Sequence, residues 1–112
     1  RLIQRNLFQV GMNGRSEILP KDAARAIGIL KQRGESFDLI LIDPPYEKGL
    51  IQETLTKLHS NRIYHGDSIL VIEHDRREPI PTMVEGWTLI RQRRIGDTLI
   101  SFLSPSNKES HG

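Results

Sequence analysis

The chain has 112 residues, 37% of them apolar and 27% charged, a length and composition that fit one globular domain. Its 16 basic and 14 acidic side chains give a net charge of +2, which is compatible with a polyanionic partner but does not require one. The absence of cysteine excludes disulfides, thiolate catalysis and cysteine-based zinc sites. No stretch has the pattern of a secretory signal or a membrane span, so we expect a cytoplasmic protein without a membrane partner.

The N-terminal region predicts a helix followed by a short strand. Apolar side chains fall near helical spacing between Arg1 and Val10, and Gly11 is expected to end this helix. Ser16 to Leu19 is a candidate strand that Pro20 terminates. Because the first residue is an arginine rather than a methionine, we expect a processed product or a fragment.

The middle of the chain predicts two helices on either side of a buried strand. Asp22 is a natural N-cap for a helix with one apolar stripe, and Gly34 is expected to end it. Phe37 to Ile42 is apolar at every position but one, a pattern typical of a parallel strand covered on both faces. A second helix is predicted from the apolar spacing between Ile51 and Leu58.

The C-terminal half predicts three more strands. Ser68 to Ile72 is a buried strand after a Gly-Asp turn and closes a βαβ unit. Trp87 to Ile95 and Thr98 to Leu103 are two strands joined by a Gly-Asp hairpin turn. The predicted fold is therefore an open α/β sheet, mostly parallel, with an antiparallel C-terminal hairpin. We expect one domain over residues 1–103 and a disordered polar tail over residues 104–112.

The strongest chemical signal is the loop Asp43-Pro44-Pro45-Tyr46 at the carboxyl end of the predicted central strand, where open α/β sheets bind ligands. Two prolines stiffen this loop, so the Asp43 carboxylate and the Pro44 carbonyl can serve as neighbouring acceptors. An exocyclic amine offers two donors in one plane and fits that pair. Tyr46 is then placed to stack on a base. The structural alternative is a plain turn that ends the strand.

This loop resembles the (Asp/Asn/Ser)-Pro-Pro-(Tyr/Phe/Trp) signature of S-adenosylmethionine-dependent amino-methyltransferases. Five further segments, in the same order and spacing, resemble the bacterial RsmD-type 16S rRNA guanine-N2-methyltransferases, and the resemblance runs from Arg1 to about Leu103. The segments are Ile3-Gln4-Arg5-Asn6-Leu7, Lys21-Asp22-Ala23, Phe37-Asp38-Leu39, Val71-Ile72-Glu73-His74 and Arg94-Ile95-Gly96-Asp97-Thr98.

The resemblance implies a partial Rossmann-like sheet of a class I methyltransferase. The loop Asp43-Pro44-Pro45-Tyr46, which we call the clamp loop, would be its catalytic element. Asp43 and the Pro44 carbonyl would hold the guanine N2 amine, with Pro45 stiffening the loop. Tyr46 would stack on a base flipped out of its helix. The sulfonium methyl group would pass directly to nitrogen, so neither a metal nor a covalent intermediate is expected.

For the cofactor, the resemblance implies that Asp22 accepts a hydrogen bond from the adenine amine, beside the Ala23 N–H, with Asp43 also bordering S-adenosylmethionine. Capping of a helix explains Asp22 without any cofactor. The family's glycine-rich loop and its acidic strand end are absent from this sequence, so we expect the chain to be inactive by itself. We also expect the strand Ser16 to Leu19, without its family neighbour, to be displaced, poorly ordered or paired with another chain.

The implied partner is small-subunit ribosomal RNA or its assembly particle. Arg76 and Arg77 are the candidate phosphate contacts, with solvated surface charge as the alternative. Arg91 and Arg93 alternate along a predicted strand and share a face, whereas Arg94 points to the other face, which argues against a single patch there.

Two other functions stay open. The same clamp serves enzymes that methylate adenine N6 or cytosine N4 in DNA, because it recognises an amine rather than one base. A non-catalytic RNA-binding module that keeps only this part of the fold is the alternative outside enzymes. Metal chemistry is not expected, because His74 has no other histidine at coordination spacing and fits a structural or surface role better.

Overall fold

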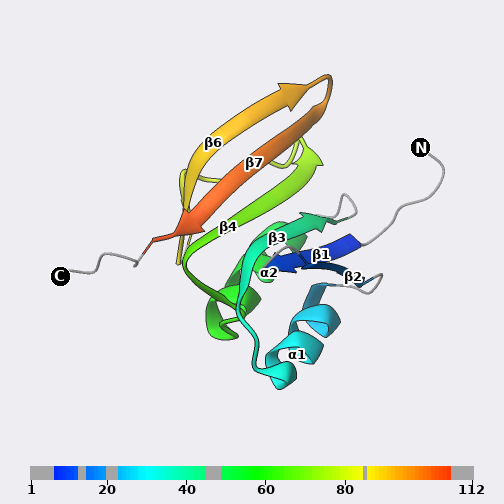
Figure 1. Ribbon diagram of the computed structural model, residues 1–112. Coiled ribbons are helices and arrows are strands. Elements are labelled where there is room, and N and C mark those ends of the chain that lie inside the picture. The colour runs from blue at the N-terminus through cyan, green and yellow to red at the C-terminus, as the bar shows by residue number, and fades with distance from the viewer. Residues whose placement is uncertain (1–6, 13–14, 20–22, 45–48, 85, 107–112) are drawn as a thin grey trace.

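The computed structural model describes residues 7–12, 15–19, 23–44, 49–84 and 86–106. Seven strands form one sheet in the order β2-β1-β3-β4-β7-β6-β5, and two helices pack against it (Figure 1). The elements are β1 (Leu7–Met12), β2 (Arg15–Leu19), α1 (Ala23–Arg33), β3 (Phe37–Asp43), α2 (Leu50–Ser60), β4 (Tyr64–Asp75), β5 (Met83–Val84), β6 (Trp87–Ile95) and β7 (Thr98–Pro105). Neither helix among the described residues is long and apolar enough to cross a bilayer.

The predicted βαβ unit is confirmed as β3, α2 and β4, the two strands of which pair in parallel. The expected Gly-Asp turn before the second strand is instead part of a longer strand. β4 runs through Gly66 and Asp67, and the register shifts there. Tyr64 pairs with Phe37 and Ile69 with Leu39, so a step of five residues along β4 corresponds to a step of two along β3. A β-bulge therefore replaces the turn, and the strand begins at Tyr64 rather than Ser68.

The helix predicted between Arg1 and Val10 is wrong for its described part. Leu7 to Met12 form β1, which pairs antiparallel with both β2 and β3, while residues 1–6 lie outside the described part of the chain. An Asn-Gly pair between two apolar runs is a strong hairpin signal, and the edge of β3 offers backbone partners that a helix cannot use. Strand pairing at this edge overrides the helical spacing.

The strand predicted at Ser16 to Leu19 is confirmed as β2, but it does not lack a neighbour. β1 lies between β2 and β3 and pairs with both, so β2 forms the edge of the sheet within the same chain. The mostly parallel arrangement expected from the sequence is also inexact. β3 and β4 form the parallel pair, and the other five pairings are antiparallel.

The C-terminal hairpin is confirmed as β6 and β7, which pair antiparallel from Trp87 and Pro105 to Ile95 and Thr98. β7 extends to Pro105, so the polar tail expected from residue 104 is wrong for its first two residues. Residues 107–112 of that tail lie outside the described part of the chain.

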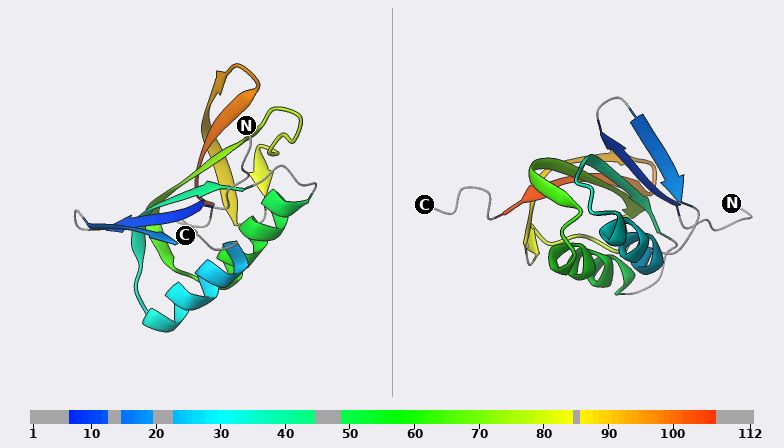
Figure 2. Two further views of the ribbon diagram at one scale, coloured as in Figure 1. Left: turned by 90° about the vertical axis from the view of Figure 1, so that its right-hand side faces the viewer. Right: turned by 60° about the horizontal axis from the view of Figure 1, so that its bottom comes forward.

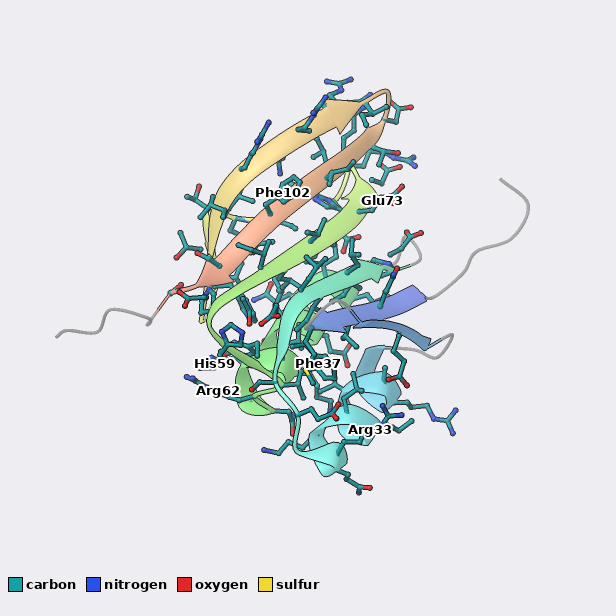
Figure 3. The ribbon with its side chains drawn as sticks, in the orientation of Figure 1. Arg33, Phe37, His59, Arg62, Glu73 and Phe102 are labelled. Carbon is teal, nitrogen blue, oxygen red and sulfur yellow. The ribbon has the colours of Figure 1, made fainter. Side chains whose placement is uncertain are left out.

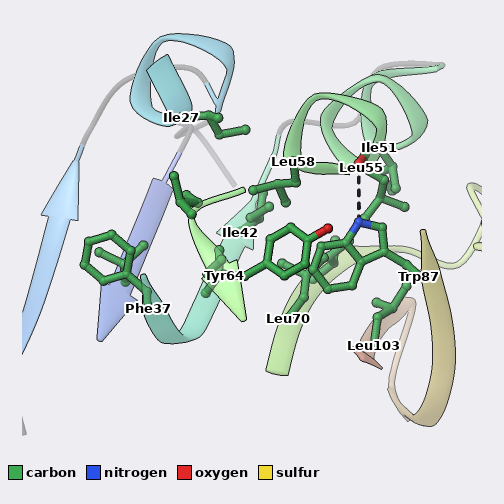
Figure 4. Close-up of a cluster of buried hydrophobic side chains, with 14 of the residues drawn as sticks. Ile27, Phe37, Ile42, Ile51, Leu55, Leu58, Tyr64, Leu70, Trp87 and Leu103 are labelled. Carbon is green, nitrogen blue, oxygen red and sulfur yellow. Dashed lines mark hydrogen bonds between the residues drawn. The ribbon is translucent and has the colours of Figure 1, made fainter. Parts of the chain in front are cut away.

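Both helices pack on one face of the sheet (Figure 2), where their apolar stripes meet the strands in a single core. Trp87 is fully buried there; its ring centroid lies 4.6 Å from that of Tyr64, and its Nε1 donates to the Leu55 carbonyl at 3.3 Å (Figure 4). Trp87 and Phe37 are thus core residues.

The opposite face of the sheet, here called the helix-free face, carries no helix of the described chain (Figure 2). Ile40 and Ile42 of β3 point into the core, whereas Leu39 is 39% exposed and Leu41 half-buried. Burial of the central strand on both faces, as expected from its sequence, is therefore wrong. Phe102 of β7 is likewise half-buried, since it pairs with Val71 on the helix-free side.

Candidate active site

The carboxyl ends of three strands lie at one edge of the sheet, which we call the carboxyl edge. β3 ends there at Asp43 and β4 at Asp75, because these two strands are parallel. β2 also ends there, since Leu19 lies level with Phe8 of β1, and Phe8 lies level with Ile42 of β3. Ligands of open α/β sheets bind at this kind of edge.

Asp43 and Pro44 are the parts of the clamp loop that the structure describes. Asp43 is half-buried and Pro44 is buried directly after β3. Pro45 and Tyr46 lie outside the described residues, so their roles stay predictions. The acceptor half of the clamp is therefore held at the end of a buried parallel strand.

Asp43 lines a cavity of about 220 Å³ that opens on the helix-free face. Glu73 of β4 lines the same cavity, together with Gln9 of β1 and Ile100 of β7. Figure 3 shows Glu73 at the carboxyl edge, near the end of β4. The two carboxylates come from neighbouring parallel strands, and an acidic cavity of this kind favours a cationic ligand.

The predicted cofactor residues lie at the start of α1. Asp22 lies outside the described residues, and Ala23 is the first residue of the helix. Because α1 follows β2, which ends at the carboxyl edge, the topology brings Ala23 to the same edge as Asp43 with β1 between them. The backbone N–H groups in the first turn of a helix have no partner within the helix, so they suit a ligand acceptor.

Arg76 and Arg77, the predicted phosphate contacts, both form ion pairs. Arg76 Nε lies 2.9 Å from Asp97 Oδ1. Arg77 Nε lies 2.8 Å from Asp75 Oδ1, and its Nη2 donates to Asp75 Oδ2 at 3.0 Å. The hydrogen bonds from Arg77 lower the pKa of Asp75 to about 2. These guanidinium groups already neutralise carboxylates, which weakens the prediction that they hold phosphates.

A hydrogen-bonded chain that the sequence did not reveal ties the C-terminal hairpin to Gly49, which directly precedes α2. Gln92 Nε2 donates to Ser101 Oγ at 2.8 Å, and Ser101 Oγ lies 2.7 Å from His74 Nε2. His74 Nδ1 lies 2.9 Å from the Glu78 carbonyl, and the Glu78 carboxylate accepts from the Gly49 N–H at 3.2 Å.

These partners determine the protonation pattern of the buried imidazole. A carbonyl oxygen only accepts, so His74 Nδ1 carries the proton that it donates to Glu78. Nε2 forms the other hydrogen bond of the ring, with the Ser101 hydroxyl, a group that can donate or accept. The structural role predicted for His74 is confirmed, because its ring is 6% exposed and holds the loop after β4 in place.

A second cavity, of about 500 Å³, lies between α2 and the loop that follows β4. Its walls are mainly apolar, from Ile51 and Leu55 of α2 and Ile80 of the loop, and Glu78 and Gly49 also line it. Gly49 lies only three residues beyond Tyr46, so this cavity adjoins the clamp loop along the chain. Within the described residues, no cluster of acidic and histidine side chains is arranged to hold a metal ion.

Comparison with known proteins agrees with this architecture. A conserved hypothetical protein from Streptococcus pyogenes has a similar structure, with a TM-score of 0.68 and 24% sequence identity; the match covers 84% of this chain and 57% of that one. This likeness confirms the α/β fold class. The two helices and the mixed sheet of this chain match part of that longer protein.

Curated relatives are ribosomal RNA methyltransferases by name. Ribosomal RNA small subunit methyltransferase D of Escherichia coli K12 is 27% identical over 73 residues, which are 65% of this chain and 37% of that protein. The protein of the same name from Buchnera aphidicola subsp. Acyrthosiphon pisum is 32% identical over 63 residues, which are 56% of this chain and 32% of that protein. The chain thus spans about a third of the length of these relatives.

The model of the family described as "Conserved hypothetical protein 95" matches residues 1–104, nearly the whole chain. The chain therefore belongs to this family, the RsmD-type family that its motifs indicate.

Proposed function

We propose that this chain is the catalytic C-terminal part of an S-adenosylmethionine-dependent methyltransferase that acts on the exocyclic N2 of a guanine in small-subunit ribosomal RNA. The observation that carries the proposal is the position of Asp43 and Pro44 at the end of the central parallel strand, beside an acidic cavity. The names of the curated relatives support ribosomal RNA as the substrate class.

The described residues fit part of a cofactor site. S-adenosylmethionine carries a sulfonium cation, and the carboxylates of Asp43 and Glu73 line one cavity that suits a positive charge. Ligand pockets usually enclose about 300–1,000 Å³, so a cavity of about 220 Å³ holds only part of such a molecule. We infer that Asp43 and the first turn of α1 contact the cofactor and that further protein must complete its pocket.

The clamp residues would perform the chemistry by positioning. Bound S-adenosylmethionine supplies an electrophilic methyl group. The Asp43 carboxylate and the Pro44 carbonyl accept the two N–H groups of the guanine amine and turn its nitrogen lone pair toward that methyl. The amine would lose one proton on methylation, and the Asp43 carboxylate that holds its N–H group would be the acceptor for that proton.

A base that reached the cavity lined by Glu78, which is separate from the cavity of Asp43, would meet a carboxylate that selects guanine over the alternative bases. Guanine has an N1–H donor next to its N2 amine, whereas adenine and cytosine have an acceptor nitrogen next to theirs. Glu78 lines the cavity of about 500 Å³ beside the clamp loop, and a carboxylate accepts several hydrogen bonds, so it can bind Gly49 and a base together. A carboxylate there pairs with guanine and repels the acceptor edges of adenine and cytosine.

Calorimetric titration of S-adenosylmethionine is the first test. We expect weak or no binding to this chain and clear binding once it is extended by any residues that its gene encodes upstream. Tight binding to the short chain would show that the cofactor site is misplaced, and no binding to either form would favour a non-catalytic RNA-binding module.

The second test uses Asp43→Ala in a form that binds the cofactor, with ribosomal RNA and duplex DNA as substrates and mass spectrometry to identify the methylated base. We expect N2-methylguanine from RNA, a loss of at least about 100-fold in turnover in the variant, and little change in cofactor affinity. Unchanged turnover would remove Asp43 from the mechanism. Methylation of adenine or cytosine in DNA would support the alternative enzyme.

A further inference from the structure

The outer edge of β6 carries three arginines that the candidate active site does not use. Arg91, Arg93 and Arg94 are all exposed. None of them forms an ion pair with another described residue, in contrast to Arg33, Arg76 and Arg77. We call Arg91, Arg93 and Arg94 the arginine edge.

The backbone of β6 is open along this edge. β5 pairs only with Trp87 and Thr88 at the start of β6, so among the described residues no strand lies outside Arg91 to Ile95. An edge strand presents side chains on both of its faces and free backbone N–H groups between them. Arg91 and Arg93 on one face and Arg94 on the other therefore flank one continuous line along the edge.

A β-bulge sets the direction of these side chains. Leu89 pairs with Leu103 and Arg91 with Phe102, so Ile90 is an extra residue on β6. Without this residue, Arg91 would lie opposite Ser101 on the core side. The bulge turns Arg91 and Arg93 to the helix-free face and leaves Ile90 53% exposed.

The arginine edge leads to the carboxyl edge of the sheet. Thr98 at the start of β7 pairs with Asp75 at the end of β4, so the hairpin tip lies where β3 and β4 end (Figure 1). Arg93 pairs with Ile100, which lines the cavity of Asp43 and Glu73. Three cations thus lie along a path that ends beside the predicted methyl-transfer site.

Hydrogen bonds also join the hairpin to the end of β4 and to the loop after it. The hydrogen-bonded chain from Gln92 through Ser101 and His74 to Glu78 joins β6 to the residue that binds Gly49. Arg76 at the end of β4 pairs with Asp97 at the hairpin tip, through both a side-chain bond of 2.9 Å and its backbone N–H. A ligand held on β6 therefore keeps a defined position relative to the clamp.

We propose that the arginine edge binds the phosphate backbone of single-stranded RNA and directs the strand toward the clamp loop. Arginine is suited to this role, because its planar guanidinium donates two parallel hydrogen bonds to a phosphate. Exposed Ile90 and Ile95 on the same strand offer apolar contacts for bases. Phosphate contacts of this kind position a nucleic acid without reading its sequence. The inference rests on the proposed function for its choice of RNA as the partner.

The test compares two triple variants of this chain. The first is Arg91→Gln, Arg93→Gln and Arg94→Gln. The control is Lys31→Gln, Lys57→Gln and Arg62→Gln, which removes the same charge from exposed residues. These residues lie at the end of the molecule opposite the carboxyl edge, where Figure 3 shows Arg62. Binding of a fluorescein-labelled single-stranded RNA of mixed sequence is measured by anisotropy between about 50 and 200 mM salt, and circular dichroism checks the fold.

We expect the arginine-edge variant to lose at least about tenfold in affinity and about 2 units from the slope of log K against log salt, since each lost phosphate contact removes about 0.7. The control should change affinity by less than about twofold. A third variant, with lysine at the same three positions, should retain most of the binding, because a lysine still contacts a phosphate as a point charge.

An unchanged salt slope in the arginine-edge variant, or an equal loss in the control, would overturn the proposal. Equal binding and equal loss with duplex DNA would identify a general polyanion surface and would also overturn the assignment to single-stranded RNA. RNA binding needs no methyl donor, so the two proposals fail separately. RNA binding without methyl transfer by a form that binds the cofactor removes the proposed function, and methyl transfer with an inert arginine edge removes only this inference.

Discussion

The two faces of the sheet contain similar amounts of apolar sequence but differ in what covers them. On the helix-covered face, Ile40 and Leu70 are fully buried under α1 and α2. On the helix-free face, Leu39 is 39% exposed, and Leu41 and Phe102 are half-buried. Alternate residues of the same strand thus have different energetic roles, although hydrophobicity alone does not distinguish them.

The difference shows that an apolar strand sequence indicates that both faces can be covered. It does not show that both faces are covered in a given chain. β3 has the composition of a strand covered on both faces. The described chain supplies helices to one face, and side chains of neighbouring strands shield the other only in part. Four experiments, with six substitutions between them, test this description of the sheet.

Loss of Trp87 should have the largest effect. Its indole is fully buried, contacts the ring of Tyr64 at a tilt of 46° and donates to the Leu55 carbonyl of α2. Trp87→Ala is expected to lower the free energy of unfolding by about 3–5 kcal/mol, through the cavity and the lost contacts. Urea unfolding followed by far-ultraviolet circular dichroism measures the change. A loss below about 1 kcal/mol would mean that the hairpin is not packed on α2 as described.

Adjacent residues of β3 provide a matched pair across the sheet. Ile40→Ala should cost about 2–5 kcal/mol, because it leaves a cavity beneath the helices. Leu39→Ala should cost less than about 1 kcal/mol, since a surface side chain loses little burial. Both values come from the same urea titrations. Equal costs would show that the helix-free face is covered in solution.

The buried polar chain should respond at an intermediate level. His74→Ala removes the ring that joins Ser101 to Glu78 and leaves their buried groups without this partner. The expected cost is about 1–3 kcal/mol, and amide hydrogen exchange should rise first in the loop after β4. Ser101→Ala is the control, because it removes the hydroxyl that bonds to His74 Nε2 and Gln92 Nε2 but keeps the bond from His74 to Glu78, and it should cost less. Exchange that rises evenly over the whole chain would contradict a local positioning role.

The ion pair between Arg77 and Asp75 should give the smallest effect on stability. The direction in which this effect changes with pH follows from the pKa of Asp75. Arg77 lowers this pKa to about 2, from the ordinary value of 3.8. The ion pair therefore stabilises the fold in full above about pH 4, and this contribution is lost as the pH falls toward 2. Arg77→Gln should return the Asp75 titration toward its ordinary value, as measured by carboxyl chemical shifts in nuclear magnetic resonance. A titration that stays near pH 2 would assign the shift to other groups.

The elements with strong local signals were predicted correctly from the sequence. α1 ends at Gly34, which has φ 74°, a left-handed conformation that glycine adopts without strain. The second predicted helix is α2, and the Gly-Asp pair at residues 96–97 joins β6 to β7. These features depend on neighbours within a few residues, so a sequence pattern contains the required information.

The N-terminal region was predicted wrongly because its structure depends on a distant partner. The spacing of apolar residues before Gly11 fits a helix, but the free edge of β3 pairs with Leu7 to Met12 as a strand. The Asn-Gly pair after Met12 was the signal that pointed to a hairpin. Backbone pairing at the edge of a sheet is a tertiary interaction, and local periodicity does not contain it.

For the candidate site, the sequence alone determined the place of the clamp loop after a buried strand and predicted its chemistry, because a proline pair following an apolar run is a local feature. Only the tertiary structure decided which groups surround that loop. Glu73 meets Asp43 at one cavity, His74 links the hairpin to Glu78, and the arginine edge ends beside the same site. These residues lie on separate strands, and strand order and register, which arise from backbone pairing across the whole sheet, bring them together.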